Sequence, residues 1–349
     1  MWRQSRTNDP VKQLSNTGRV TLARTLVVCG GLLGLLAIAF LVSSILGAQR
    51  LSFSGVMCAL TGSSNCSLSG AERAILFDIR LPRIFLAAAV GTCLAAAGAA
   101  YQALLRNPLA EPYLLGVSNG AAVGTMAALV FFGAHEWSRP VMAFAGAIGA
   151  TFVVYRLARG RAGASPERLI LAGVIVTTFL SSAIVFITTV MDATRIRSFT
   201  FWLLGDLSGT TSSLLAVAFV AAAIGVAALV MNARALNLMM LGERDAFDLG
   251  VEVGRVRLIV FAAASLLVGA SVASSGSVGY VGLVVPHLVR LSFGSDNRLV
   301  IPAAAIAGAT FVIVADTLAR TVIAPRELPV GAITALIGAP LFVYLLRRG

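Results

Sequence analysis

One stretch of the chain, from Arg80 to Leu105, has the length and composition of a helix that crosses a lipid bilayer. Arg80-Leu81-Pro82-Arg83 opens it, about twenty mostly apolar or small residues follow, and Arg106-Asn107-Pro108 closes it. At a rise of ~1.5 Å per residue, such a run spans a hydrocarbon core of ~30 Å. Pro108 cannot continue a helix and disfavours helical backbone at the residue before it. The sequence therefore predicts a membrane helix that ends in a structured polar turn.

A second apolar segment follows this turn and carries glycine at every fourth position. Gly116, Gly120 and Gly124 would share one face of a helix. Glycine lets a neighbouring backbone approach closely, which is one way in which helices associate in lipid. We therefore expect a second membrane helix with a close-packed face.

The whole chain has the composition of an all-α polytopic membrane protein. Of its 349 residues, 58% are hydrophobic and 12% are charged, which is more apolar than a soluble domain of this length requires. Hydropathy and helix breakers predict about ten membrane helices, near residues 25–48, 81–105, 115–134, 140–158, 168–191, 211–232, 255–274, 277–293, 299–319 and 329–346. The net charge of +12 does not indicate a nucleic-acid partner, because the basic residues are scattered at helix ends.

The distribution of basic residues predicts the orientation of these helices. Loops on the side of the N-terminus hold 18 of the 27 lysines and arginines, and the opposite side holds 9. By the positive-inside rule, both termini are expected in the cytoplasm. Residues 1–24 are then a cytoplasmic tail, and residues 25–349 form the transmembrane domain. The second and seventh spans open similarly (RLPRIFLAAAVGTCLAAAG and GRVRLIVFAAASLLVGA), which suggests an inverted repeat.

Three local features have readings that the residues alone leave open. Cys58 and Cys66 lie in the first outward loop and are either a disulfide or two free thiols. Asp316 and Arg320 are four residues apart, a spacing that favours an ion pair within one helix. The inward loop 238–253 combines apolar and acidic residues, so it is either a surface loop or a docking segment.

The sequence contains no recognisable site for nucleotide or metal. Its single lysine, Lys12, follows Val11, so no Gly-Lys-Ser/Thr phosphate-binding motif is present. The sequence also has no Cys/His cluster with metal-ligand spacing. We therefore expect no catalytic residue, no bound cofactor and no metal ligand in this polypeptide.

Three ordered motifs resemble one known family, the permease subunits of bacterial ABC importers for iron chelates, haem and cobalamin (FecCD-like, type II importers). They are RLPR followed by RNPLAEP and LGVSNGA, then GSVGYVGLVVPHLVR, and finally ADTLAR with ELPVGAITALIGAPLFVYLLRR. The resemblance implies a homodimeric permease in the inner membrane, with two separate ATP-binding subunits and a periplasmic substrate-binding protein. It implies import of an iron compound, either haem or a ferric siderophore, with cobalamin as the alternative. An ion-coupled secondary carrier is less favoured, because such carriers need titratable groups near the midplane.

The resemblance also implies roles for individual residues. Arg80, Arg83 and Arg320 would face the periplasm and dock the binding protein. Asn107 and Leu109 would form a cytoplasmic gate, opposite the segment Ser165-Pro166-Glu167. The loop 238–253 would couple to the ATPase through residues on and beside a short helix, namely Leu241, Gly242, Glu243, Asp245, Phe247, Leu249 and Gly250.

Overall fold

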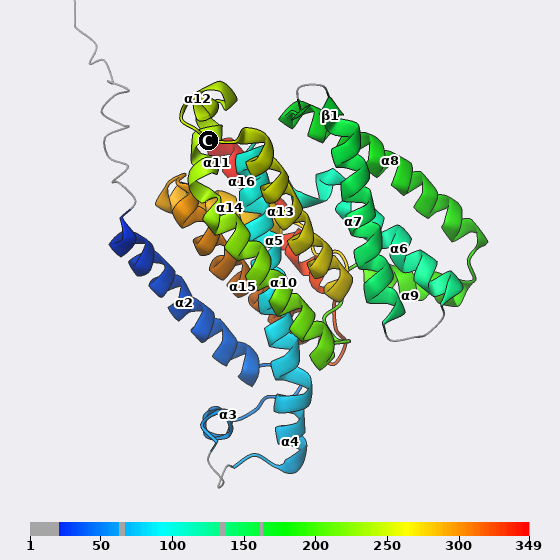
Figure 1. Cartoon of the computed structure of the whole chain (residues 1–349). Helices are drawn as coiled ribbons and strands as arrows, with labels where there is room; N and C mark the ends of the chain where they lie inside the picture. The colour runs from blue at the N-terminus through cyan, green and yellow to red at the C-terminus, as the bar shows by residue number, and fades with distance from the viewer. Residues whose placement is uncertain (1–20, 63–66, 133–136, 161–162, 349) are drawn as a thin grey trace, which may run out of the picture.

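The computed structural model describes residues 21–62, 67–132, 137–160 and 163–348, and in it the chain is a bundle of helices (Figure 1). Each of the ten predicted membrane spans coincides with a helix, so the predicted fold class is confirmed. These helices are α2 (Leu22–Ile45), α5 (Leu81–Leu104), α6 (Val117–Phe131), α7 (Ser138–Ala158), α8 (Pro166–Val190), α10 (Ser212–Met231), α13 (Val253–Ser275), α14 (Val281–Phe293), α15 (Asn297–Thr321) and α16 (Val330–Arg348).

The ten helices are not equivalent in length. In the described residues, seven are long and apolar enough to cross a membrane, and α6, α14 and α16 are shorter. The predicted spans at 115–134 and 277–293 therefore began too early. The 13 residues of α14 rise only ~20 Å, less than the ~30 Å hydrocarbon core. Irregular backbone at residues 276–280 precedes this helix, and its N-cap residue, Tyr280, has a positive φ of 66°.

Several shorter elements connect the predicted spans, and of these only a short helix in the loop 238–253 was expected, from the family resemblance. They are α3 (Phe53–Leu60), α4 (Gly70–Ala74), the π-helical turn η1 (Ile75–Arg80), the 3-10 turn η2 (Pro112–Leu115), the strands β1 (Arg159–Gly160) and β2 (Gly163–Ala164), α9 (Ala193–Leu203), α11 (Ala233–Leu241) and α12 (Glu243–Asp248). Because α4, η1 and α5 are continuous, the second span begins at Gly70 and not at residue 81. Figure 1 shows α12 and β1 at one end of the bundle and α3 and α4 at the other.

Helix α5 forms the centre of the bundle, with 20 of its 24 residues buried. Its small residues allow direct backbone contact with its neighbours. A Cβ added to Gly91 would lie 2.1 Å from the carbonyl oxygen of Gly308 on α15, and one added to Gly98 would lie 1.9 Å from that of Gly282 on α14. Such contacts stabilise helix pairs in lipid, where the hydrophobic effect does not.

The glycine-rich face of the third span packs as predicted for two of its three glycines. Gly120 and Gly124 of α6 abut the backbone of α7 at Gly146 and Met142, where an added Cβ would meet carbonyl oxygens at 2.4 and 1.9 Å. The prediction is wrong for Gly116, which precedes the helix and adopts a left-handed conformation with φ of 78°. This residue ends η2 and turns the chain into α6.

Helices α2 and α8 have strongly apolar surfaces that the rest of the chain does not cover. In their most apolar windows only 6% and 17% of residues are buried, although mean hydropathy is 2.6 and 2.4. In water such surfaces would be unstable or would be covered by a partner. Lipid is the solvent that suits them, and α-helices satisfy their own backbone polar groups there.

Irregular backbone meets inside the bundle where three helices begin or end. The N–H groups of Val330 and Gly331, at the start of α16, donate to the carbonyls of Gly205 and Leu204. The N–H of Asp206 donates to the carbonyl of Ser275 at the end of α13. These bonds satisfy backbone groups that have no partner within a helix.

Candidate functional site

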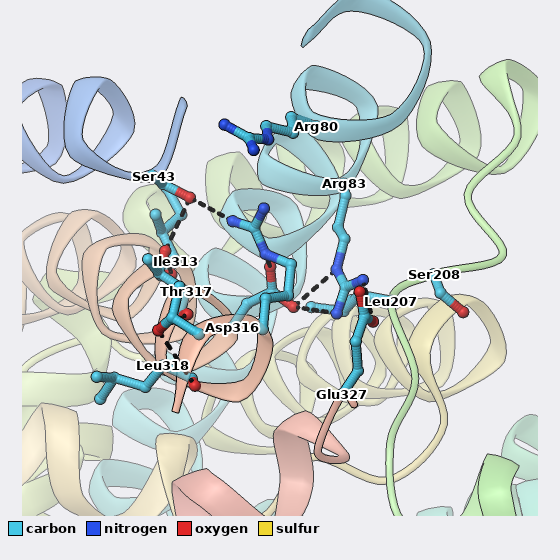
Figure 2. Close-up of polar contacts among 12 residues, drawn as sticks. Ser43, Arg80, Arg83, Leu207, Ser208, Ile313, Asp316, Thr317, Leu318 and Glu327 are labelled. Atoms are coloured by element: carbon cyan, nitrogen blue, oxygen red, sulfur yellow. Dashed lines mark hydrogen bonds and ion pairs between the residues drawn. The ribbon is translucent and has the colours of Figure 1, made fainter. Parts of the chain in front are cut away.

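One end of the bundle holds the three arginines that the sequence analysis singled out, and we call it the arginine end. Arg83 of α5 binds Asp316 of α15, with its Nε and Nη2 each 2.9 Å from Oδ1. Its Nη1 donates to Oε2 of Glu327 at 2.7 Å, in the loop before α16 (Figure 2). Arg83 therefore joins three segments of the chain.

Asp316 is shared by a second arginine from its own helix. Arg320 Nε lies 3.0 Å from Asp316 Oδ2, which confirms the predicted ion pair within α15. The Nη2 of Arg320 also donates to the hydroxyl of Ser43 on α2 at 2.8 Å. Ser43 accepts a further hydrogen bond from Thr317, so α2 is held to α15 by hydroxyl groups and one guanidinium (Figure 2).

Arg80 binds the C-terminal end of α2. Its Nη1 donates to the carbonyls of Ser44 and Ile45 at 2.8 and 2.9 Å, and its Nη2 donates to the carbonyl of Gln49. The last carbonyls of a helix lack intrahelical partners and carry partial negative charge, so a cation is stabilising there. Gly47 makes room for the guanidinium, because an added Cβ would lie 2.5 Å from it.

The structure thus brings the three arginines together but does not present them as free surface side chains. Arg80, Arg83 and Arg320 are 3%, 6% and 6% exposed, and each has partners within the chain. They border an open pocket of about 270 Å³ beside Glu327, which is half exposed. The family resemblance implied arginines that face the periplasm and dock the binding protein, and local sequence could not show that they have partners within the chain. Here a buried carboxylate and helix-terminal carbonyls hold them inside.

The opposite end, which we call the coupling end, holds the predicted coupling segment, residues 238–253. Two glycines divide it: α11 ends before Gly242 (φ 158°), and α12 ends before Gly250 (φ 84°). Three apolar side chains project from it with no cover from the described chain. Leu241, Phe247 and Leu249 are 72%, 70% and 63% exposed. A short helix with an uncovered apolar face is suited to insertion into a groove of a partner protein.

The acidic residue that opens α12 makes ion pairs that the sequence did not predict. Glu243 Oε1 lies 2.5 Å from Nη2 of Arg257, a buried arginine of α13. The same oxygen lies 3.8 Å from Nη2 of Arg106, in the turn after α5. The sequence signal was weak, because these residues are far apart in the chain and have no helical spacing.

The turn at residues 105–111 contains both predicted gate residues. Asn107 Oδ1 accepts a hydrogen bond from the N–H of Leu109 at 2.9 Å, which fixes the turn, and Arg106 before it has a positive φ of 49°. The side chain of Leu109 is 43% exposed. In the segment predicted to oppose them, the Ser165 hydroxyl accepts from the N–H of Arg168 and caps α8.

The cysteines are found in two states. Cys58 is disulfide-bonded, whereas Cys29 and Cys93 are free thiols. Cys66 lies outside the described residues, so its pairing with Cys58 stays a prediction. Most of the predicted N-terminal tail also lies outside them. Within the described part of the chain, no three His, Cys, Asp or Glu side chains are grouped so that they could hold a metal ion.

Comparison with known proteins agrees with this architecture. The model of the FecCD transport family matches residues 35–348. The hemin transport system permease protein HmuU of Yersinia pestis is 39% identical over 327 residues, which is 92% of this chain and 96% of that protein. The cobalamin import system permease protein BtuC of Halobacterium salinarum is 43% identical over 273 residues, 78% of this chain and 73% of that protein.

A solved structure shows the same fold over nearly the whole chain. It belongs to a protein assigned to the metal-chelate type of ABC transporter, in an inward-facing conformation. It is 31% identical and superposes with a TM-score of 0.80, covering 93% of this chain and 100% of its own. With the family model and the relatives, this likeness identifies the chain as a multi-pass membrane permease of ABC importers, a member of the FecCD transport family.

Proposed function

We propose that this permease works as a homodimer that moves an iron compound, haem or a ferric siderophore, from the periplasm to the cytoplasm. Two copies of a separate ATP-binding subunit would drive it, and a periplasmic substrate-binding protein would deliver the substrate. The observation that carries the proposal is the coupling segment. Its exposed Leu241, Phe247 and Leu249 form an apolar surface at one end of a membrane bundle, where a soluble partner would bind.

ATP hydrolysis by a partner subunit is the energy source that we propose. The chain has no phosphate-binding Gly-Lys-Ser/Thr motif, so ATP would be bound and hydrolysed by the partner. The excess of basic residues supports a cytoplasmic location for the coupling end, where ATP is available. The arginine end would then face the periplasm. There, the pocket beside Arg80 and Arg320 is open to an acidic side chain of the binding protein.

The turn at residues 105–111 would form the gate on the cytoplasmic side, with Asn107 and Leu109 facing the segment at Ser165. Movement of the coupling segment would open and close it. Import of cobalamin is the second candidate function. It is supported by the 43% identity to the Halobacterium salinarum permease, whereas the nearly full-length match to the hemin permease supports an iron compound.

The test is uptake by liposomes that contain the permease together with its ATP-binding subunit and binding protein. We expect ATP-dependent accumulation of haem or a ferric siderophore, and none with the permease alone under a proton or sodium gradient. Gradient-driven uptake without the ATP-binding subunit would overturn the proposal. Accumulation of cobalamin in place of iron compounds would select the second candidate.

A further inference from the structure

We propose that Glu243 is a positioning residue that links the coupling segment to both gate segments through Arg106 and Arg257. This inference rests on the proposed function, because it assumes that an ATP-binding subunit moves α12. It adds a specific charge cluster through which such a movement would reach the turn at residues 105–111.

The cluster joins four elements of the fold. Glu243 opens α12, Arg257 lies on α13, and Arg106 lies in the turn that holds the candidate gate. The Glu243 Oε1 contacts both arginines, at 2.5 Å for Arg257 and 3.8 Å for Arg106. Glu167, in the first turn of α8, interacts electrostatically with the same two arginines. Glu243 thus makes the ion pairs, and Glu167 interacts with the same two arginines at longer range.

Arg257 makes this arrangement sensitive to the position of α12. It is 4% exposed, its Nη2 pairs with Glu243, and its Nε has no hydrogen-bond partner among the described residues. Its charge is compensated mainly by the ion pair with Glu243. A buried charge that loses its partner is strongly destabilising, so α12 cannot withdraw without a rearrangement of Arg257.

Space for such a movement exists beside α12. An open pocket of about 670 Å³ lies between Glu243 and Phe247 on one side and Tyr155 and Arg159 of the α7 end on the other. If α12 shifts, Glu243 would lose its contacts with Arg106 and Arg257. Glu167, which already interacts electrostatically with both arginines, would then become their acidic partner. The exchange would draw the two arginines toward α8 and so change the spacing of the two gate segments.

The test compares three variants in the complete transporter, with ATP-binding subunit and binding protein, in liposomes. Glu243→Gln removes the charge at the centre of the cluster. Arg106→Gln removes only the ion pair between Glu243 and the turn that holds the candidate gate. Because the Arg106 side chain is 38% exposed, this substitution does not introduce an unpaired buried group. Arg298→Gln is the matched control, since Arg298 lies outside the coupling segment and its 42% exposed side chain pairs with its neighbour Asp296.

We expect Glu243→Gln and Arg106→Gln to retain the ATP-binding subunit and to hydrolyse ATP. Substrate moved per ATP should fall about tenfold, which corresponds to a coupling energy within the usual range for linked sites. Arg298→Gln should match the wild type. A second readout is hydrogen exchange at amides 105–111 after trapping with ADP and vanadate. Trapping should change exchange in the wild type and in Arg298→Gln but not in the two cluster variants.

The outcomes separate this inference from the proposed function. No ATP-dependent uptake by the wild type would overturn the proposed function itself. Wild-type uptake with an unchanged transport ratio and a normal exchange response in Arg106→Gln would overturn the role of Glu243 alone. If Glu243→Gln does not assemble, Arg106→Gln decides the question.

Discussion

The guanidinium group of Arg83 on α5 and the carboxylate of Asp316 on α15 form a buried ion pair. The two residues are 233 positions apart in the sequence. The Arg83 and Asp316 side chains are 7% and 1% exposed. Arg320 approaches the same carboxylate from the other oxygen. One buried acid thus contacts two buried cations, and Glu327 gives Arg83 a second carboxylate.

Asp316→Asn should be severely destabilising because it leaves Arg320 buried without a compensating anion and leaves Arg83 with Glu327 alone. We expect a loss of about 3–5 kcal/mol in the free energy of unfolding, as for other broken buried pairs. Thermal unfolding of the purified protein in detergent measures it. Glu252→Gln is the control, because its pair with Arg255 is more than 70% exposed at both side chains and such pairs contribute ~0–1 kcal/mol. Equal effects of the two substitutions would contradict the structural role of Asp316.

Of the two ion pairs that Asp316 forms, the sequence predicted one. The Asp316–Arg320 pair follows from the helical spacing of four residues, and it was predicted. The contact of Arg83 with Asp316 depends on how α5 and α15 cross, which local spacing does not encode. The membrane helices were predictable because lipid demands long apolar runs. The short α14 and the irregular backbone before it were not, because buried protein contacts satisfy that backbone.

The close crossing of α5 and α14 predicts that Gly98→Ala destabilises the bundle. The added Cβ would lie 1.9 Å from the carbonyl oxygen of Gly282, which is backbone and cannot move aside alone. Overpacking of this kind costs about 1–3 kcal/mol, and unfolding in detergent would measure it. Gly149→Ala on α7 is the matched control, since nothing lies within 4 Å of its added Cβ. It should be neutral or slightly stabilising, because alanine is the better helix former. A neutral Gly98→Ala would mean that the helices do not cross this closely.

Glu111, in the turn between α5 and η2, predicts a dependence of stability on pH. Burial raises the pKa of its carboxyl above the ordinary value of 4.5, and the N–H of Tyr280, which donates to Oε1 at 3.2 Å, opposes the rise. The folded protein thus keeps this proton to higher pH than the unfolded chain does. The stability that Glu111 contributes is complete below pH 4.5 and is lost as pH rises through the raised pKa.

Glu111→Gln should remove this dependence while keeping an acceptor for Tyr280. The difference in melting temperature between variant and wild type should therefore grow in favour of the variant as pH rises above 4.5. Glu252→Gln, at a residue whose side chain is 72% exposed, serves as the control and should show no such trend. A constant difference across the range would show that burial does not affect this carboxyl.

The gate prediction is tested by replacing Asn107 and Leu109 together with alanine. The side-chain Oδ1 of Asn107 fixes the turn by accepting from the N–H of Leu109, and the Leu109 side chain is the apolar group that the turn exposes. The double variant should widen the constriction on the coupling side. We expect substrate leak or ATP hydrolysis without transport, with normal assembly of the complex. Tight coupling of ATP hydrolysis to uptake in this variant would show that the gate lies elsewhere.

The coupling residues were predicted from a family resemblance, and their geometry explains why the sequence alone left them open. Leu241, Phe247 and Leu249 look like the apolar side of an ordinary amphipathic turn until the fold shows that nothing covers them. Glu243, by contrast, was grouped with them as a docking residue, yet its carboxylate points at Arg257 of the same chain. The fold is needed to tell an outward-facing side chain from an inward-facing one.

Phe247 should therefore be a dominant contact for the ATP-binding subunit and should contribute little to the stability of the permease. Its side chain is 70% exposed on α12, and aromatic anchors that fill a partner's groove commonly contribute 2 kcal/mol or more. Phe247→Ala should weaken binding of the ATP-binding subunit about thirtyfold, the equivalent of that energy, while leaving the melting temperature of the isolated permease unchanged. Phe53→Ala is the matched control, because Phe53 is 61% exposed on α3 at the arginine end. Binding of the purified ATP-binding subunit to permease in nanodiscs measures both variants. If Phe247→Ala binds like Phe53→Ala, α12 is not the surface on which the ATP-binding subunit docks.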